Sequence, residues 1–302
     1  MKIKKVIPSG YCKGVINAIE IAKKARRDNM DAPIYILGMI VHNSYVTEAL
    51  NTLDIITLDD KKKNKEELLD EIDSGIVIFT AHGIAESIKE KATNKGLTII
   101  DASCSDVIKT QDIIKEKIKE GFNVLYIGKK NHPEALAVLS ISQNIHLISS
   151  IDDIKKTQIP EPIFVTNQTT MSIFEIRNIN EKIKEKWPKA IICEEICNAT
   201  SMRQKAIMNL KNCDLLYVVG DPRSNNTNKL KQIALDSGIK KVRMIETAKE
   251  IDENDLDVEN IYITAGASTP TYLTNQVIEC LNNYNLNHEL NIQDIDIYKI
   301  LF

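Results

Sequence analysis

The 302-residue sequence lacks several features that would assign it to a common protein class. No stretch reaches the ~18 apolar residues that a transmembrane helix needs. The N-terminal segment MKIKKVIPSGYC lacks the apolar core of a signal peptide. With a net charge of -3 and a pI near 6.0, the protein lacks the excess of basic residues that most nucleic-acid-binding domains have. We therefore expect a cytoplasmic protein that binds neither membranes nor nucleic acid.

Familiar cofactor motifs are also missing. The sequence has no CxxC pair, so it gives no support for a zinc ribbon or a thioredoxin-like site. It contains no Walker A loop and no GxGxxG fingerprint, so no motif indicates nucleotide binding. Disulfides are uncommon in cytoplasmic proteins, so we expect the six cysteines to be thiols, ligands or nucleophiles.

What the sequence does contain is a concealed repeat. Cys12, Cys104 and Cys197 are separated by 92 and 93 residues, and each closes a strand-like run. A segment with helical periodicity follows each cysteine. A second landmark recurs in phase, because each of three apolar strands ends in a glycine that is followed four residues later by a polar side chain. The pairs are Gly38 and His42, Gly128 and His132, and Gly220 and Ser224.

This periodicity predicts an α/β fold of three pseudo-equivalent lobes. Alternating strands and helices are typical of parallel sheets that carry helices on their faces. We place the repeats at residues 12–103, 104–196 and 197–285, with residues 286–302 as a C-terminal tail. The third repeat lacks its own counterpart of the strand LTIIDASC. We expect the strand Lys2–Ile7 to fill that place, so that residues 1–11 belong to the third repeat.

The three phased cysteines predict a metal centre. Sites in parallel α/β sheets form beyond the carboxyl ends of the strands, where we expect these thiolates to meet. Thiolates commonly hold iron–sulfur clusters, and three of them leave one iron of a cubane open. The alternative is three buried cysteines that act as small apolar residues, but their matched phase favours the cluster. The unmatched Cys193, Cys213 and Cys280 are assigned to core packing.

Polar residues at the ends of the same strands predict a phosphate pocket. Helix N-termini that point to one centre favour a bound anion. The candidates are His42, His82, His132, Ser224, Asn225, Asn226 and Ser268. Each has an ordinary alternative: Ser224, Asn226 and Ser268 suit helix N-caps, and Glu134 suits the first turn of a helix. It is their matched phases that favour a single site.

Together these motifs resemble the 4-hydroxy-3-methylbut-2-enyl diphosphate reductase family. The resemblance rests on GYCKGV, VHNSYV, TAHG, DASC, HPE, NQTT, ICNAT, RSNNTN and AGAS, which span Gly10 to about Ser268. It implies three α/β lobes around a central [4Fe–4S] cluster and the last step of non-mevalonate isoprenoid biosynthesis. The implied substrate is an allylic diphosphate, and the implied electron donor is a reduced ferredoxin or flavodoxin.

The resemblance also implies residue roles. Cys12, Cys104 and Cys197 match the cluster ligands and leave one iron open to the substrate. Glu134 matches the carboxylate that delivers a proton, with Thr169 as its relay and Gln168 in the same QTT motif. The diphosphate positions are matched by His42, His82, His132, Thr169, Ser224, Asn226 and Ser268. We expect a diphosphate beside Glu134 to raise the pKa of its carboxyl group, because like charges disfavour ionisation.

The sequence departs from the family pattern at three places, and it leaves rival functions open. Asn225 stands where serine is expected, which puts one diphosphate contact in doubt. Ser105 replaces a usual proline and Asn17 a usual arginine near the cluster. The rivals are a redox or iron sensor that uses the same thiolates, a related reductase with another phosphorylated substrate, and a three-thiolate zinc site.

Overall fold

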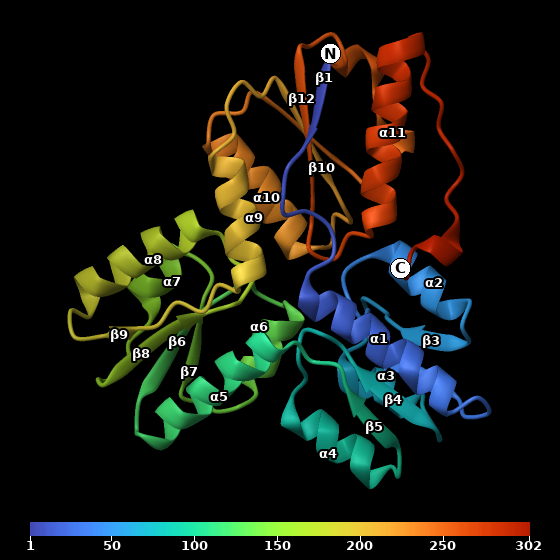
Figure 1. Cartoon of the computed structure of the whole chain (residues 1–302). Coiled ribbons are helices and arrows are strands. Elements are labelled where there is room, and N and C mark those ends of the chain that lie inside the picture. The colour runs from blue at the N-terminus through green and yellow to red at the C-terminus, as the bar shows by residue number, and fades with distance from the viewer. The chain divides into compact units, whose positions relative to one another are not determined.

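The computed structural model describes residues 1–302 and contains three four-stranded sheets, in which every strand pair is parallel (Figure 1). Sheet A has the order β1 (Lys2–Lys5), β12 (Asn260–Ala265), β10 (Leu215–Val219), β11 (Lys241–Ile245). Sheet B has the order β3 (Ile55–Leu58), β2 (Ile34–Leu37), β4 (Ile76–Phe79), β5 (Thr98–Asp101). Sheet C has the order β7 (Ile145–Ile148), β6 (Asn123–Ile127), β8 (Ile163–Asn167), β9 (Ile191–Ile192). The predicted three-lobed α/β class is confirmed.

Helices alternate with these strands along the chain. The α-helices are α1 (Lys13–Asp28), α2 (Ser44–Asn51), α3 (Lys65–Asp70), α4 (Glu86–Asn94), α5 (Ser105–Lys119), α6 (Pro133–Leu139), α7 (Ile151–Lys156), α8 (Ile173–Lys186), α9 (Asn198–Met208), α10 (Asn225–Asp236) and α11 (Thr271–Asn287). Three short 3₁₀ helices follow, η1 (Ala248–Glu250), η2 (Glu253–Asp255) and η3 (Ile297–Lys299). None of the helices is long and apolar enough to cross a membrane.

The three sheets share one strand order. β1 lies beside β12 in the place that β5 has beside β4 and β9 has beside β8. The register runs in parallel from Lys2 opposite Asn260 to Lys5 opposite Ile263. The N-terminal strand therefore completes the sheet of the third repeat, as its phase predicted. The exact repeat boundaries stay a prediction.

The chain forms two compact units that do not follow the repeats. The first unit comprises residues 1–16, 41–52 and 198–302, and it holds sheet A. The second comprises residues 17–40 and 53–197, and it holds sheets B and C. Each unit contains part of the predicted site, and each is described below by itself.

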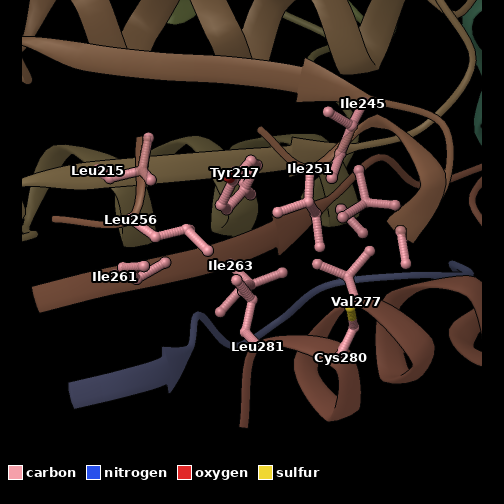
Figure 2. Close-up of a cluster of buried hydrophobic side chains, with 13 residues drawn as sticks. Leu215, Tyr217, Ile245, Ile251, Leu256, Ile261, Ile263, Val277, Cys280 and Leu281 are labelled. Atoms are coloured by element: carbon pink, nitrogen blue, oxygen red, sulfur yellow. The ribbon is translucent and has the colours of Figure 1, made fainter. Parts of the chain in front are cut away.

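In the first unit, helices cover both faces of sheet A. One core joins β10, β11 and β12 to α11 through residues such as Tyr217, Ile263 and Leu281 (Figure 2). On the opposite face, Leu216 and Val218 pack against α9 and α10. Because both faces are covered, all five residues of β10 are buried, which explains why its sequence LLYVV is uniformly apolar.

In the second unit, sheets B and C have similar cores. On sheet B, β2 and β4 pack against α3 and α4 through residues that include Leu69 and Phe79. On sheet C, one face packs against α7 and α8, and the other packs against α5 and α6. The cores fix the strands, and the loops after their carboxyl ends carry most of the predicted site residues.

Candidate active site

The three phased cysteines occupy equivalent positions, each directly before a helix. Cys12, Cys104 and Cys197 precede α1, α5 and α9, and all three are partly exposed and outside any disulfide. Each backbone N–H donates a hydrogen bond to a carbonyl in the loop that follows a strand, which is β12 for Cys12, β4 for Cys104 and β8 for Cys197. The bonds run from Cys12 to Ala267 (3.1 Å), from Cys104 to Ala81 (3.0 Å) and from Cys197 to Thr169 (3.1 Å). A helix N-terminus stabilises a thiolate, so this donor set fits a thiolate-held cluster.

The remaining cysteines have a different environment. Cys280 is buried in the core of the first unit, and Cys213 and Cys193 are partly buried against apolar clusters. Burial raises the pKa of the Cys213 thiol to about 11 and also raises the pKa values of Cys193 and Cys280. These three thiols therefore stay protonated at neutral pH, in agreement with packing roles.

No group of three or more His, Cys, Asp or Glu side chains is arranged to hold one ion. The three-thiolate zinc site stays an alternative that metal analysis tests.

Glu134 lies at the centre of a buried hydrogen-bond network in the second unit. Its side chain is in the first turn of α6, and the residue is only 2% exposed. Thr169 donates from its backbone N–H to Oε1 (2.8 Å) and from its hydroxyl to Oε2 (3.0 Å). The Tyr126 hydroxyl donates to Oε1 over 3.2 Å. The predicted pairing of Glu134 with Thr169 is thus present in the geometry.

The environment of Glu134 suits proton transfer near neutrality. Burial raises the pKa of its carboxyl group to about 7, although the hydrogen bonds from Thr169 and Tyr126 act to lower it. Burial alone gives this rise, and the further rise expected beside a bound diphosphate stays a prediction. A carboxyl group with a pKa near the working pH offers both the acid and the base form.

Tyr126 is a residue that the sequence reasoning missed. It lies within the buried strand β6, and its hydroxyl is directed at Glu134. A tyrosine inside a fully apolar run is a usable signal, because its buried hydroxyl must find a partner.

Two of the predicted histidines come together in the second unit. The rings of His82 and His132 are 5.7 Å apart in an edge-to-face arrangement. His132 caps α6, and its Nδ1 accepts the Glu134 backbone N–H over 3.2 Å. In the neutral ring this bond assigns the proton to Nε2.

Gln168 supports the loop before His132. It is fully buried, its Oε1 accepts the Lys129 backbone N–H (2.9 Å), and its Nε2 donates to the Thr170 hydroxyl (2.9 Å). Its amide group therefore holds two loops of sheet C together. Among the QTT residues, Thr169 is the one that contacts Glu134.

The first unit gathers a second group of predicted residues. The Ser268 hydroxyl donates to the His42 carbonyl oxygen over 3.1 Å, and its Oγ lies 3.2 Å from Ser224 Oγ. Ser224 is the N-cap of α10 and accepts the Thr227 backbone N–H (3.3 Å). The N-cap alternative for Ser224 is therefore observed, beside its contact with Ser268.

Ser268 itself is not at a helix start, which corrects the prediction. The helix α11 begins at Thr271, with Pro270 as its N-cap. A proline disfavours the helical conformation at the residue before it, so Ser268 and Thr269 lie outside the helix. The Ser268 side chain is left to contact His42 and Ser224 instead of capping a helix.

Asn225 and Asn226 are both buried in the first turn of α10, and Asn226 is 4% exposed. The Asn226 Oδ1 lies 3.5 Å from the Thr200 hydroxyl, whereas its Nδ2 has no hydrogen-bond partner. Leaving a buried donor unsatisfied costs about 1–3 kcal/mol. Asn226 Nδ2 is therefore a buried donor that the protein itself leaves unsatisfied, next to the N-cap Ser224.

Asp221 links the two loops that carry these residues, and the sequence reasoning missed it. Its buried carboxylate accepts the Ser44 backbone N–H (3.0 Å) and pairs with Arg223 (2.7 Å). Burial acts to raise its pKa, but the bonds from Arg223 and Ser44 outweigh burial, so the pKa lies below the usual range. Asp221 therefore stays ionised and ties the loop of His42 to the start of α10.

Comparisons with known proteins agree with these motifs. Residues 3–282 match the model of the LytB protein family. A Bacillus cereus protein named 4-hydroxy-3-methylbut-2-enyl diphosphate reductase is 49% identical over 290 residues, which are 94% of this chain and 91% of that protein. A Bacillus anthracis protein with the same name shows the same identity and coverage.

Solved structures give the same relationship. The E-1-hydroxy-2-methyl-but-2-enyl-4-diphosphate reductase of Plasmodium falciparum matches with a TM-score of 0.88 and 30% identity, over 97% of this chain and 91% of that one. A structure of (E)-4-hydroxy-3-methyl-but-2-enyl diphosphate reductase matches with a TM-score of 0.67 and 28% identity, over 94% of this chain and 100% of that one. With its phased cysteines, its three parallel sheets and these matches, the chain belongs to the LytB family.

Proposed function

We propose that this chain reduces (E)-4-hydroxy-3-methylbut-2-enyl diphosphate to isopentenyl diphosphate and dimethylallyl diphosphate, the last step of non-mevalonate isoprenoid precursor synthesis. Its relatives at 49% identity carry the name of this reductase. The observation that carries the proposal is the buried Glu134, held by Thr169 and Tyr126 with a pKa of about 7. A reaction that expels hydroxide needs such an acid.

The diphosphate group supplies binding energy away from the reacting bond. We assign His42, His82, His132, Thr169, Ser224, Asn225, Asn226 and Ser268 to it. The orphaned Asn226 Nδ2 supports this assignment, because a buried amide donor is suited to a phosphate oxygen. Fixing the diphosphate orients the allylic hydroxyl at the other end of the substrate.

Cys12, Cys104 and Cys197 would hold a [4Fe–4S] cluster through three cysteine ligands. When bound, the cluster supplies electrons and, at its open iron, a Lewis acid for the substrate hydroxyl. We assign the electron donor to a reduced ferredoxin or flavodoxin. A cytoplasmic location stays a prediction from the sequence.

Glu134 provides the proton that makes the hydroxyl a leaving group. Its acid form is present in a large fraction near pH 7, and its base form can be reprotonated from outside. The Thr169 hydroxyl, 3.0 Å from Oε2, can relay that proton. Burial of the network keeps bulk water from competing for it.

The first test is iron and acid-labile sulfide per chain after anaerobic purification, followed by turnover of the allylic diphosphate with a strong reductant. We expect about four of each per chain in the parent. Cys104→Ser should lose the cluster, whereas Cys213→Ser should keep it. A cluster without turnover would favour the sensor alternative, and turnover only of another phosphorylated substrate would favour the related reductase. Little iron and sulfide after reconstitution would contradict the cluster itself.

A further inference from the structure

The two carboxyl oxygens of Glu134 have unequal hydrogen-bond partners. Oε1 accepts two bonds, from the Thr169 backbone N–H (2.8 Å) and from the Tyr126 hydroxyl (3.2 Å). Oε2 accepts one bond, from the Thr169 hydroxyl (3.0 Å). The acid form must carry its proton on one of these oxygens, and an oxygen that already accepts two donors is the poorer place for it. The arrangement therefore favours a proton on Oε2.

A proton on Oε2 is the one that the Thr169 hydroxyl can take up. A hydroxyl group can donate and accept at once, so it can accept the Oε2 proton while its own hydrogen turns to another acceptor. A proton on Oε1 would instead face the Thr169 backbone N–H, which only donates. Of the two oxygens, Oε2 alone is bonded to a group that can pass a proton on.

The second donor to Oε1 comes from a side chain that has no other polar partner. Tyr126 is fully buried in β6, and its hydroxyl forms a hydrogen bond only to Glu134. Burial, together with the adjacent carboxyl group, raises the pKa of the Tyr126 phenol well above its ordinary value. The phenol therefore keeps its proton and remains a donor across the range in which Glu134 titrates.

Packing fixes the Tyr126 ring against the helix that carries Glu134. The ring shares one core with Ala135 and Val138, which lie on α6. On its other side the ring lies close to the backbone, because a Cβ atom on Gly128 would lie only 3.0 Å from Tyr126 Cε1. The direction of the hydroxyl is therefore set by the core and does not depend on the carboxyl group alone.

We propose that Tyr126 is a positioning residue that keeps the acid proton of Glu134 on Oε2, where the Thr169 hydroxyl takes it up. The inference rests on the function proposed above, because it assigns the proton of that reaction to one oxygen. In the step, Oε2 releases its proton to Thr169 Oγ1 as the threonine passes its own proton to the departing hydroxyl of the substrate. Glu134 is left as a carboxylate, the hydroxyl leaves as water, and threonine is unchanged.

Other titratable groups surround this carboxyl group. Asp106, in the first turn of α5, carries a negative charge that acts to raise the pKa of Glu134. His132 precedes Glu134 and accepts its backbone N–H, and the His82 ring lies 5.7 Å from that of His132. His146 lies on β7 between two residues of the core under α5 and α6, so its side chain points to the opposite face of sheet C. The variant described next leaves all of these groups in place.

The first test is Tyr126→Phe in the anaerobic holoenzyme, because it removes the hydroxyl and keeps the ring. Iron content and KM should match those of the parent, whereas kcat should fall about tenfold. The decline of kcat at alkaline pH should move up by about one pH unit, because a bond that acts to lower the pKa of Glu134 is lost. The control Tyr217→Phe, at another fully buried tyrosine whose hydroxyl has no partner, should match the parent throughout.

Two further measurements ask whether Tyr126 acts through the carboxyl group. In Glu134→Gln, the added change Tyr126→Phe should lower kcat no further, because the proton is already absent. Infrared spectroscopy of the holoenzyme isolates the Glu134 carboxyl band by subtraction of Glu134→Gln. With the proton on Oε2, the C=O oxygen is Oε1, so loss of the Tyr126 donor should move the C=O band to higher wavenumber and raise its titration midpoint.

The possible results separate this inference from the proposed function. An unchanged kcat profile in Tyr126→Phe, an unchanged infrared band, or equal effects in Tyr217→Phe would overturn the role of Tyr126. A further loss of kcat in the Glu134→Gln background would also overturn it, because the tyrosine would then act independently of the carboxyl group. Absence of turnover in the parent would instead contradict the reductase function, while the infrared band would still decide which oxygen carries the proton.

Discussion

At the scale of single residues, burial explains more of the site than motif matching does. The sequence identified Glu134 and Thr169, and the structure shows why the carboxyl group is tuned: burial raises its pKa to about 7. The apolar run around Tyr126 indicates that its buried hydroxyl has a partner, but only the structure identifies that partner as Glu134. The amide of Gln168 was predicted in the same motif, yet its contacts are to neighbouring loops.

Replacing Glu134 with glutamine should remove the proton donor while keeping the cluster and substrate binding. We expect kcat to fall by about 100-fold or more, since a positioned acid contributes roughly 10²–10⁴-fold. The parent kcat should decline as pH rises through about 7, because the acid form is lost, and the variant should lack this limb. Near-normal turnover in the variant would remove Glu134 from the mechanism.

We also expect Glu134→Gln to change how the stability of the protein depends on pH. Because the folded-state pKa of Glu134 is raised from 4.5 to about 7, the group contributes stability below pH 4.5 that is lost as pH rises through 7. The Tm of Glu134→Gln relative to the parent should therefore increase between pH 5 and pH 8. A constant Tm difference across this range would contradict a raised pKa.

At the scale of elements, the phase of the repeats predicted the strands, but the reasons behind equivalent positions differ. Gly38 and Gly220 have φ values of +92° and +148°, which favour glycine. Gly128 has an ordinary φ, but a Cβ atom there would crowd the side chains of Tyr126 and Gln168. One pattern of glycines thus hides two physical causes. The N-cap alternative for Ser268 is not observed, because α11 begins at Thr271 with Pro270 as its N-cap.

Asp221 should act as a positioning residue that orders two loops of the first unit. In Asp221→Asn the ion pair with Arg223 is lost and the bond from Ser44 weakens. We expect KM for the diphosphate substrate to rise about tenfold, or about 1.4 kcal/mol, with kcat little changed. The control Asp236→Asn, at the far end of α10, should leave both constants unchanged. A fall in kcat at constant KM would assign Asp221 to the chemical step instead.

At the scale of the whole molecule, three sequence repeats fold into two compact units, and the first unit is assembled from three separate segments. The cysteine spacings of 92 and 93 residues predict the three sheets, but they predict nothing about the tail after the third repeat. In the structure the tail belongs to the first unit: η3 packs on α2, Ile300 is buried, and its carbonyl oxygen accepts the Tyr11 hydroxyl (2.9 Å). Tyr11 immediately precedes Cys12, so the end of the chain supports the loop of a predicted cluster ligand.

Ile300→Ala should therefore destabilise the fold and loosen the cluster together. Removing this buried side chain should cost about 2–5 kcal/mol of the free energy of unfolding. Denaturant unfolding would measure that loss, and iron content over time at a fixed temperature should fall faster than in the parent. The control Tyr298→Ala removes a side chain in the same tail that is 70% exposed, so its effect should stay within about 0.5 kcal/mol. If Ile300→Ala unfolds more easily but keeps its iron as long as the parent does, the tail stabilises the first unit without supporting Cys12.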